Sequence, residues 1–323
     1  MTAQLLEVEG LRVRLPTASG YTTVVDGVGY RVEAQQVFGI AGESGSGKTM
    51  SMLALMGLLP PGSVVEGRVL YGGRNLLTLG RAALRRVCGR EIAMVFQDPL
   101  TSLHPMLPIG RQLTEHTRRH LGLDHRQAEA RALDLLEQVR IPDPAGALHA
   151  YPHQFSGGMR QRIAIGIALA CRPKLLIADE PTTALDVTVQ AGIIRLLDRL
   201  RRETGLTVIL ITHDLGVMSS IADLVSIFYA GRVVESGRTA DVIRRPRHPY
   251  TKGLLSALPH PEAPAETPLV SIPGAPPNPQ AVPPGCAFHP RCAYRVESCE
   301  RDVPPLVPVN GRALACPVDP LRP

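Results

Sequence analysis

One short segment constrains the fold more than any other, and it comprises Gly42, Glu43, Ser44, Gly45, Ser46, Gly47, Lys48 and Thr49. It matches the phosphate-loop pattern G-x-x-x-x-G-K-[ST], between an apolar run at residues 37–41 and a helical pattern at residues 50–59. Glycines allow backbone N–H groups and the helix N-terminus to surround phosphates. The alternative is a glycine-rich turn without a ligand. The strand before it and the helix after it favour a nucleotide site, with Lys48 on the β/γ-phosphates and Thr49 on Mg²⁺.

Continuous apolar runs of strand length recur along the chain, at residues 37–41, 174–178 and 207–212. Such runs are typical of parallel strands that are buried on both faces. Helical patterns at residues 126–140 and 193–200 lie between them, and this alternation predicts an α/β fold with a mostly parallel sheet. An alternating segment at residues 5–15 predicts a half-exposed strand, and residues 226–235 predict a hairpin that turns at Ala230 and Gly231.

Composition divides the chain into two parts. Of the 30 prolines among 323 residues, 19 follow residue 240, and dense proline prevents long helices and central strands. We therefore predict a regular domain at residues 1–240 and an extension at residues 241–323 that has one short helix and is otherwise irregular. Neither an apolar stretch of transmembrane length nor a signal-peptide layout is present, so we expect a cytosolic chain. The net charge of +6, without a basic block, disfavours nucleic acid as a partner.

Five further motifs follow or flank this loop in order: Gln97; Ser156-Gly157-Gly158-Met159; Asp179-Glu180; Ala184-Leu185-Asp186; and His213. In identity, order and spacing they resemble the Q-loop, signature sequence, Walker B element, D-loop and switch histidine of ABC-type ATPases. The resemblance covers about residues 5–238. It implies a nucleotide-binding domain with a mostly parallel sheet core, an antiparallel β subdomain and a helical subdomain at about residues 98–165.

The resemblance also assigns roles in ATP hydrolysis. Asp179, together with Thr49 and Gln97, is expected to hold Mg²⁺, because a hard cation prefers oxygen ligands. Glu180 is expected to act as general base on the attacking water, and His213 to contact the γ-phosphate. An isolated Asp-Glu pair could instead serve a helix N-terminus, and a lone histidine after a strand could only cap a turn. The phosphate loop in the same chain favours the catalytic interpretation.

The signature residues Ser156, Gly157, Gly158 and Met159 are expected to act on ATP held by a second ATPase subunit, so that ATP joins two such domains head to tail. Met159 stands where the family more often has Gln. Asp186 is the D-loop aspartate. Tyr21, which lies 21 residues before Gly42, is a candidate for stacking on adenine, and an ordinary loop tyrosine is the alternative.

Residues 97–105, 247–255 and 272–277 resemble the ATPase subunits of peptide and nickel permeases. This resemblance implies an ATPase that powers import of di- or oligopeptides from the cytoplasmic face of a bacterial membrane. Its partners would be a second ATPase subunit, two transmembrane permease subunits and an extracytoplasmic solute-binding protein. A soluble ABC ATPase that acts on ribosomes or nucleic acid is the alternative.

Four of the six cysteines lie in the extension, at Cys286, Cys292, Cys299 and Cys316. Clustered thiols in a cytosolic, core-poor segment point to a metal or cluster and not to disulfides. Zinc prefers tighter C-x₂₋₄-C pairs, whereas an iron–sulfur cluster accepts wider spacing. We therefore expect a [4Fe–4S] cluster, which peptide-permease relatives often carry, with zinc or unligated thiols as alternatives. Nothing in the sequence places these thiols near the phosphate site, so a structural or partner-docking role is expected.

Overall fold

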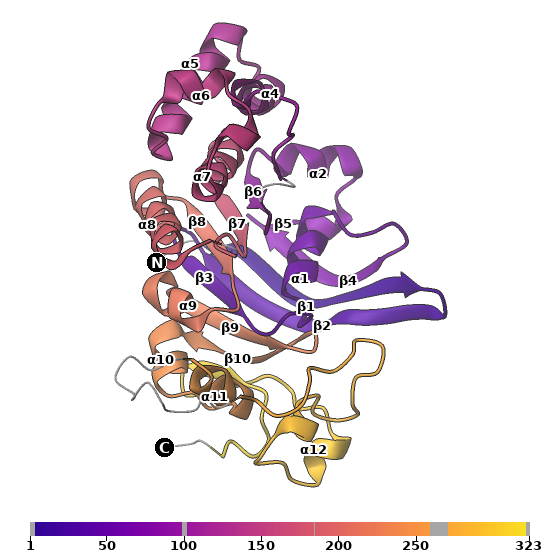
Figure 1. The fold of residues 1–323 in the computed structure, drawn as a ribbon. Helices are drawn as coiled ribbons and strands as arrows, with labels where there is room; N and C mark the ends of the chain where they lie inside the picture. Colours follow the sequence, from indigo (N-terminus) through magenta and orange to yellow (C-terminus); the bar gives the residue numbers. More distant parts are fainter. Residues whose placement is uncertain (1–3, 99–101, 184, 259–270, 321–323) are drawn as a thin grey trace. The chain divides into compact units, whose positions relative to one another are not determined.

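The computed structural model describes residues 4–98, 102–183, 185–258 and 271–320 (Figure 1). Residues 99–101 of the permease-like segment and Ala184 of the D-loop match therefore lie outside the described residues. The chain divides into two compact units. The helical unit consists of Glu33–Gln36 and Thr78–Ile211, and the phosphate-loop unit consists of Gln4–Val32, Val37–Leu77 and the chain from Thr212 onward.

The helical unit contains three parallel strands in the order β8, β7, β6. All five residues of β7 and all five of β8 are buried, as the continuous apolar runs predict. The bounds of these strands are β6 Ile92–Val95, β7 Leu175–Asp179 and β8 Thr207–Ile211. Its helices are α2 Arg81–Val87, α4 Ile109–Leu121, α5 His125–Gln138, α6 Pro144–His149, α7 Gly157–Ala168 and α8 Val187–Thr204, with the 3₁₀ turn η2 Pro152–Gln154.

Helices α4, α5, α6 and α7 pack against one another within this unit (Figure 1). Helix α5 begins after a capping box in which Asp124 and Gln127 satisfy backbone N–H groups at the helix start. Its buried face includes Ala132, Leu135 and Leu136, which confirms the predicted helical pattern. Helix α8 likewise buries the apolar face predicted for residues 193–200. No described helix is both long enough and apolar enough to cross a membrane.

The phosphate-loop unit contains a four-stranded antiparallel sheet, ordered β2, β1, β4, β5, and a second set of strands in which β3 pairs in parallel with β9. Strands β9 and β10 form the predicted hairpin, and its turn residues Ala230 and Gly231 both have positive φ. The first sheet consists of β1 Gln4–Thr17, β2 Gly20–Glu33, β4 Val64–Tyr71 and β5 Arg74–Asn75. The second set consists of β3 Val37–Ala41, β9 Leu224–Tyr229, β10 Arg232–Arg238, β11 Val307–Val309 and β12 Arg312–Leu314.

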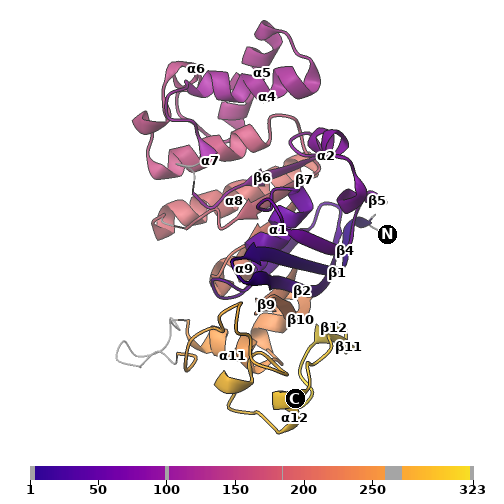
Figure 2. The same ribbon diagram turned by 90° about the vertical axis from the view of Figure 1, so that its right-hand side faces the viewer.

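Short helices complete this unit (Figure 2). They are α1 Lys48–Met56, α9 Leu215–Ile221, α10 Thr239–Arg244, α11 Pro249–Ser256 and α12 Ser298–Arg301, with the 3₁₀ turns η1 Leu76–Thr78, at the boundary between the units, and η3 His289–Arg291.

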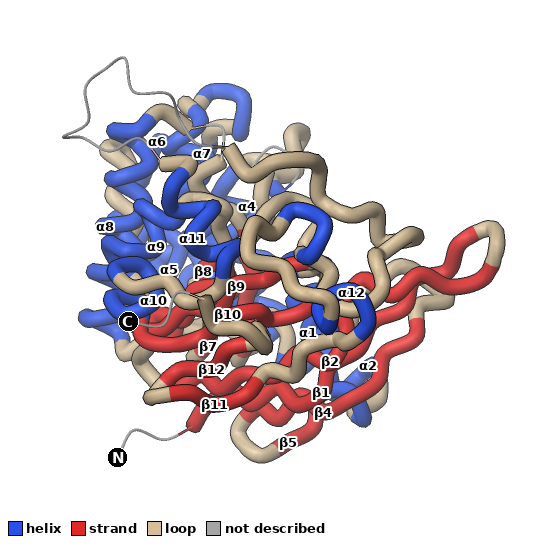
Figure 3. The backbone as a smooth tube through the Cα atoms, turned by 90° about the horizontal axis from the view of Figure 1, so that it is seen from below, coloured by secondary structure: helices blue, strands red, loops and turns tan. Residues whose placement is uncertain are grey.

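The proline-rich extension is only partly irregular, which corrects the sequence-based expectation. Strand β12 pairs antiparallel with β10, and β11 pairs with β12, so the extension lengthens the hairpin's own sheet (Figure 3). Phe288 is buried against the rings of Tyr229 and Tyr250, with centroids 5.2 Å and 5.4 Å away. Proline density could not reveal this pairing, because short strands at a sheet edge tolerate proline.

Candidate nucleotide-binding site

The phosphate-binding loop connects β3 to α1 within the phosphate-loop unit. Gly42 and Gly47 adopt φ values of 147° and 96°, which L side chains rarely reach. A Cβ atom on Gly47 would lie 2.5 Å from the carbonyl oxygen of Val24, and one on Gly42 would collide with the carbonyl oxygen of Phe228. Both positions therefore require glycine for the backbone path of the loop and for its close packing.

Lys48 is buried, and neutral oxygen atoms of the loop hold its ammonium group. Its Nζ donates to the carbonyl oxygens of Gly42 and Glu43, at 2.7 Å and 2.8 Å, and lies 3.5 Å from the Ser46 hydroxyl. The N-cap of α1 is Gly47, which has no side chain with which to cap the helix. A phosphate would therefore meet a lysine ammonium and the positive end of a helix dipole together.

His213 is exposed and precedes α9 in the same unit. The cap of that helix is Asp214, whose carboxylate accepts from the N–H groups of Gly216 and Val217. The N–H of Thr212 donates to the carbonyl oxygen of Ile40, which places this segment beside the strand that leads into the phosphate loop. Asp214 therefore caps α9, and the contact of His213 with the γ-phosphate stays a prediction.

Glu180, in the helical unit, is held through both its backbone conformation and its side chain. It follows buried Asp179, the last residue of β7, and adopts a left-handed φ of 45°, which costs free energy in a non-glycine residue. One carboxylate oxygen, Oε2, accepts from Gln97 Nε2 at 3.1 Å and from the Thr183 hydroxyl at 2.8 Å. The structure thus brings Gln97 and Glu180 together across 83 residues of sequence. Strain at a held carboxylate is typical of functional sites.

The signature residues form the start of α7. The Ser156 hydroxyl caps this helix by accepting from the Met159 N–H at 3.3 Å. Gly158 lies so close to α8 that an added Cβ would be 2.5 Å from Val189 Cγ1. Asp186 caps α8 by accepting from the Val189 N–H at 2.9 Å. The residues that match the signature and the D-loop therefore lie at the N-termini of α7 and α8. These two helix ends contact each other at Gly158 and Val189.

Tyr21 is 56% exposed at the start of β2, with the Arg14 guanidinium 5.8 Å from the centre of its ring. It borders a cavity of about 410 Å³ that is also lined by Asp26, Arg232 and Phe288. The exposed ring is available for stacking, and its assignment to adenine stays a prediction.

Cys286, Cys292, Cys299 and Cys316 line one small cavity of about 20 Å³, although 30 residues separate the first from the last. None of these four cysteines forms a disulfide. Burial, with smaller contributions from the other three thiols, raises the pKa of Cys286 to about 11. Among the described side chains, no three His, Cys, Asp or Glu residues are arranged to hold a metal ion in this conformation.

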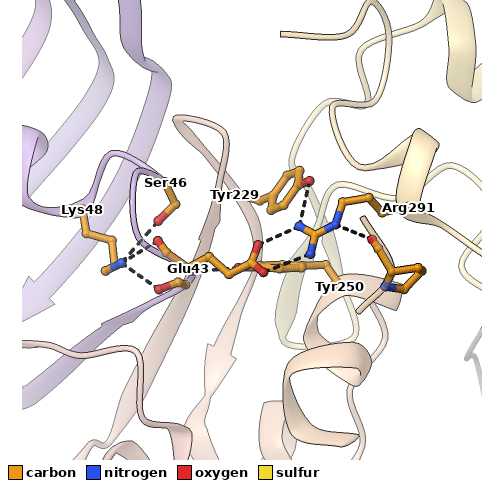
Figure 4. A network of polar contacts seen from close by, with 8 residues as sticks. Glu43, Ser46, Lys48, Tyr229, Tyr250 and Arg291 are labelled. Carbon is orange, nitrogen blue, oxygen red and sulfur yellow. Dashed lines mark hydrogen bonds and ion pairs between the residues drawn. The ribbon is translucent and has the colours of Figure 1, made fainter. Parts of the chain in front are cut away.

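Sequence reasoning missed three residues that position the site. The Thr183 hydroxyl donates a hydrogen bond to the Glu180 carboxylate. The only sequence signal for this contact is that Thr183 follows Glu180 by three residues, within one turn. Arg291 and Tyr250 contact Glu43 of the phosphate loop from the extension (Figure 4). No spacing rule links Glu43 to a residue 248 positions away, so sequence patterns could not reveal that Arg291 contacts the phosphate loop.

Comparisons with known proteins agree with this geometry. The family described as "ABC transporter" matches residues 25–183, and "Oligopeptide/dipeptide transporter, C-terminal region" matches residues 234–299. A putative peptide import ATP-binding protein of Brucella abortus is 49% identical over 98% of this chain and 95% of its own length. The oligopeptide transport ATP-binding protein OppD of Escherichia coli is 46% identical over 97% of this chain and 92% of its own.

Solved structures show the same fold. The ATP-binding cassette MJ0796, in a dimeric post-hydrolysis state bound to ADP and Pi, matches with a TM-score of 0.65 and 25% identity. That match covers 73% of this chain and 99% of MJ0796. With these relatives and the phosphate loop, signature and Walker B residues described above, the chain belongs to the ABC transporter ATP-binding proteins, in the branch that carries the oligopeptide/dipeptide transporter C-terminal region.

Proposed function

We propose that this chain is the ATP-hydrolysing subunit of an importer for di- or oligopeptides. The observation that carries the proposal is 46–49% identity, over nearly the whole chain, to proteins named for peptide import or oligopeptide transport. The extension strengthens it, because residues 234–299 match a region described from such transporters. The comparisons give no support to the alternative of a soluble ATPase acting on ribosomes or nucleic acid.

Each site residue has a proposed role in hydrolysis. The phosphate loop, from Gly42 to Thr49, binds ATP, with Lys48 on the β/γ-phosphates. Thr49, Gln97 and Asp179 would hold Mg²⁺, which would supply stabilisation of negative charge on the phosphates.

The water that attacks the γ-phosphate is activated by Glu180. Its side chain is already oriented by Thr183 and Gln97, so little reorganisation is needed when the water binds. His213 contacts the γ-phosphate, and Ser156 with its neighbouring glycines contacts ATP bound to a second ATPase subunit.

We further propose that the four extension thiols bind a [4Fe–4S] cluster. The support is that all four line one cavity, where a bound cation would displace the thiol protons into solvent. Protein purified without oxygen should be brown, with absorbance near roughly 400 nm and about four irons per chain. Cys292→Ser and Cys299→Ser should lose the colour, and Cys88→Ser, outside the cavity, should keep it. Colourless protein that contains one equivalent of zinc would contradict the cluster and indicate a zinc site instead.

The proposed assembly contains a second ATPase subunit, two membrane permease subunits and an extracytoplasmic solute-binding protein. The chain would then be peripheral, on the cytoplasmic face of the bacterial membrane. Purification in detergent of a tagged chain from its native cells tests this assembly. Recovery of permease subunits, with ATPase activity stimulated by peptide and binding protein, is the expected result, whereas recovery of ribosomes or DNA would overturn it.

A further inference from the structure

A polar network joins the phosphate-binding loop to the extension within the phosphate-loop unit. Arg291 pairs with Glu43 in a bidentate arrangement: Nη1 donates to Oε2 at 2.8 Å, and Nη2 donates to Oε1 at 3.1 Å. The Arg291 side chain is 6% exposed and that of Glu43 is 24% exposed. Two fixed N–H···O bonds at low exposure hold the carboxylate in both position and orientation.

Neighbouring groups hold Arg291 in turn (Figure 4). Its Nε donates to the carbonyl oxygen of Pro273 at 2.9 Å, and Nη1 lies 3.3 Å from the Tyr229 hydroxyl. The guanidinium lies 5.9 Å from the ring centres of both Tyr229 and Phe288. The hydrogen bonds to Glu43 raise the pKa of Arg291. Arg291 is therefore a rigid part of the extension and not a loose surface side chain.

The backbone of Glu43 is held from the same side. Its N–H donates to the hydroxyl of Tyr250 at 2.8 Å, and Tyr250 is fully buried in α11. The ring of Tyr250 packs at 4.5 Å from that of Tyr229. One loop residue is thus clamped through its main chain and its side chain by the extension and β9.

Glu43 also contacts the phosphate-binding lysine. The carbonyl oxygen of Glu43 accepts from Lys48 Nζ, so the residue that Arg291 and Tyr250 hold is one that orients Lys48. Figure 4 shows Lys48 on one side of Glu43 and Arg291 on the other. A displacement of Glu43 would therefore move an oxygen that orients the lysine ammonium.

We propose that Arg291 is a positioning residue for the phosphate-binding loop: by pairing with Glu43 it holds the loop so that Lys48 is presented to ATP. The proposal rests on the ATP-binding function proposed above. It makes nucleotide affinity depend on the pairing of Arg291 with Glu43. Arg291 is the last residue of η3, and Cys292 follows it directly in the chain. The backbone N–H of His289, the first residue of η3, donates to the carbonyl oxygen of Cys286. One short turn therefore contacts the phosphate loop through Arg291 and adjoins two cysteines of the cavity.

A purely structural role for Arg291, as an anchor of the extension, is the competing explanation, and Arg247 is a matched control for it. Arg247 is equally buried, with a side chain that is 6% exposed, and pairs with Asp319. It fastens the extension without contacting the phosphate loop in any described interaction. Arg247→Ala should therefore lower the melting temperature and leave nucleotide affinity unchanged.

The test measures the Kd of the full-length chain for a fluorescent ATP analogue, beside the melting temperature. The chain has no tryptophan, so protein fluorescence adds little background to the signal. Arg291→Ala and Glu43→Ala should each raise Kd by about tenfold or more, because small misplacements of a binding group are costly. Together they should raise Kd no further than the larger single effect. Arg291→Lys should be intermediate, since a point charge cannot make the bidentate pair.

Wild-type affinity in Arg291→Ala would overturn the proposal, as would equal weakening by Arg247→Ala or fully additive single effects. If Arg291→Ala does not fold, Arg291→Lys and Glu43→Gln decide the matter by the same Kd measurement. Glu43→Gln keeps the side-chain length and removes the charge, so an unchanged Kd in both milder variants also overturns it. Failure of the wild-type chain to bind ATP would instead refute the proposed function, which keeps the two failures distinct.

Discussion

At the scale of single residues, the site depends on side chains that are held before any substrate arrives. Glu180 has a strained backbone and two hydrogen-bond donors on one oxygen, which leaves few conformations open to it. Lys48 is surrounded by loop oxygens in the same way. Preorganisation of this kind lowers the free energy that must be spent on orientation during the reaction.

Glu180→Gln keeps the size and the hydrogen-bonding ability of the side chain but removes the base. We expect ATP binding to persist and hydrolysis to fall by about 10²–10⁴-fold, measured as phosphate release by the assembled transporter. Glu203→Gln, at the exposed end of α8, is the control and should hydrolyse ATP normally. Near-normal turnover with Glu180→Gln in each copy of the chain would refute the assignment of the base.

At the scale of elements, α7 and α8 meet through a glycine, and this contact gives a matched pair of variants. A Cβ on Gly158 would press on Val189 Cγ1, and a β-branched side chain within a helix has one strongly preferred rotamer with which to respond. Gly158→Ala should therefore lower the free energy of unfolding by roughly 1–3 kcal/mol, measured by denaturant titration.

Gly157→Ala is the control for that variant, because its Cβ would meet Leu185 Cδ2 at an ordinary 3.4 Å. There the gain in helix propensity should leave stability unchanged or raise it, by up to about 1 kcal/mol. Equal destabilisation by both variants would contradict the close packing at Gly158.

The start of α11 predicts a pH dependence. His248 caps this helix by accepting from the Tyr250 N–H at 3.1 Å, and burial lowers its pKa to about 3 from the usual 6.5. The unfolded chain therefore binds a proton between these values that the folded chain does not. Stability should fall as pH decreases from about 6.5 towards 3, by at most about 1.4 kcal/mol per pH unit.

His248→Asn separates this histidine from other acid-sensitive groups, because asparagine can cap the helix but does not titrate. The variant should show a shallower loss of stability over the same pH range, measured by thermal unfolding of both proteins in parallel. Identical pH profiles would show that other groups cause the acid sensitivity.

At the scale of the whole molecule, the structure assigns the phosphate loop and the extension to one compact unit and residues Asp179 and Glu180 to the other. Ser156 illustrates why assembly matters. Its hydroxyl caps α7 in its own chain, while its proposed nucleotide belongs to a second subunit. A substitution of Ser156 therefore has two effects that an experiment must separate: it removes the helix cap of α7, and it alters the contact with the second subunit.

Ser156→Arg should leave ATP affinity of the isolated chain nearly unchanged, because Lys48 and Thr49 are intact, and should abolish ATP-driven association of two ATPase subunits. Ser156→Ala loses the same helix cap, at a cost of about 1 kcal/mol, without adding bulk or charge. Size-exclusion chromatography of Ser156→Arg and Ser156→Ala in the presence of ATP separates the effect on association from the loss of the helix cap. Weakened ATP binding by the isolated Ser156→Arg chain would show that Ser156 serves its own site or fold.

The sequence by itself determined several of the elements and the family to which the chain belongs. Buried parallel strands at residues 37–41 and 207–212, the amphipathic α5 and α8, and the phosphate loop are all local patterns of hydrophobicity and glycine. The family could be identified for the same reason, because the order and spacing of short motifs are visible in the sequence alone. The domain boundary near residue 240 and the assigned site residues remain predictions.

Tertiary structure alone decided which distant residues meet. Strand β12 joins β10, four cysteines border one cavity, and Arg291 reaches Glu43, each across a separation that no helical or strand period encodes. Local pattern follows from the conformational preferences of neighbouring residues. Long-range pairing follows from which buried charges and apolar faces find partners when the whole chain packs, and that depends on all of the chain at once.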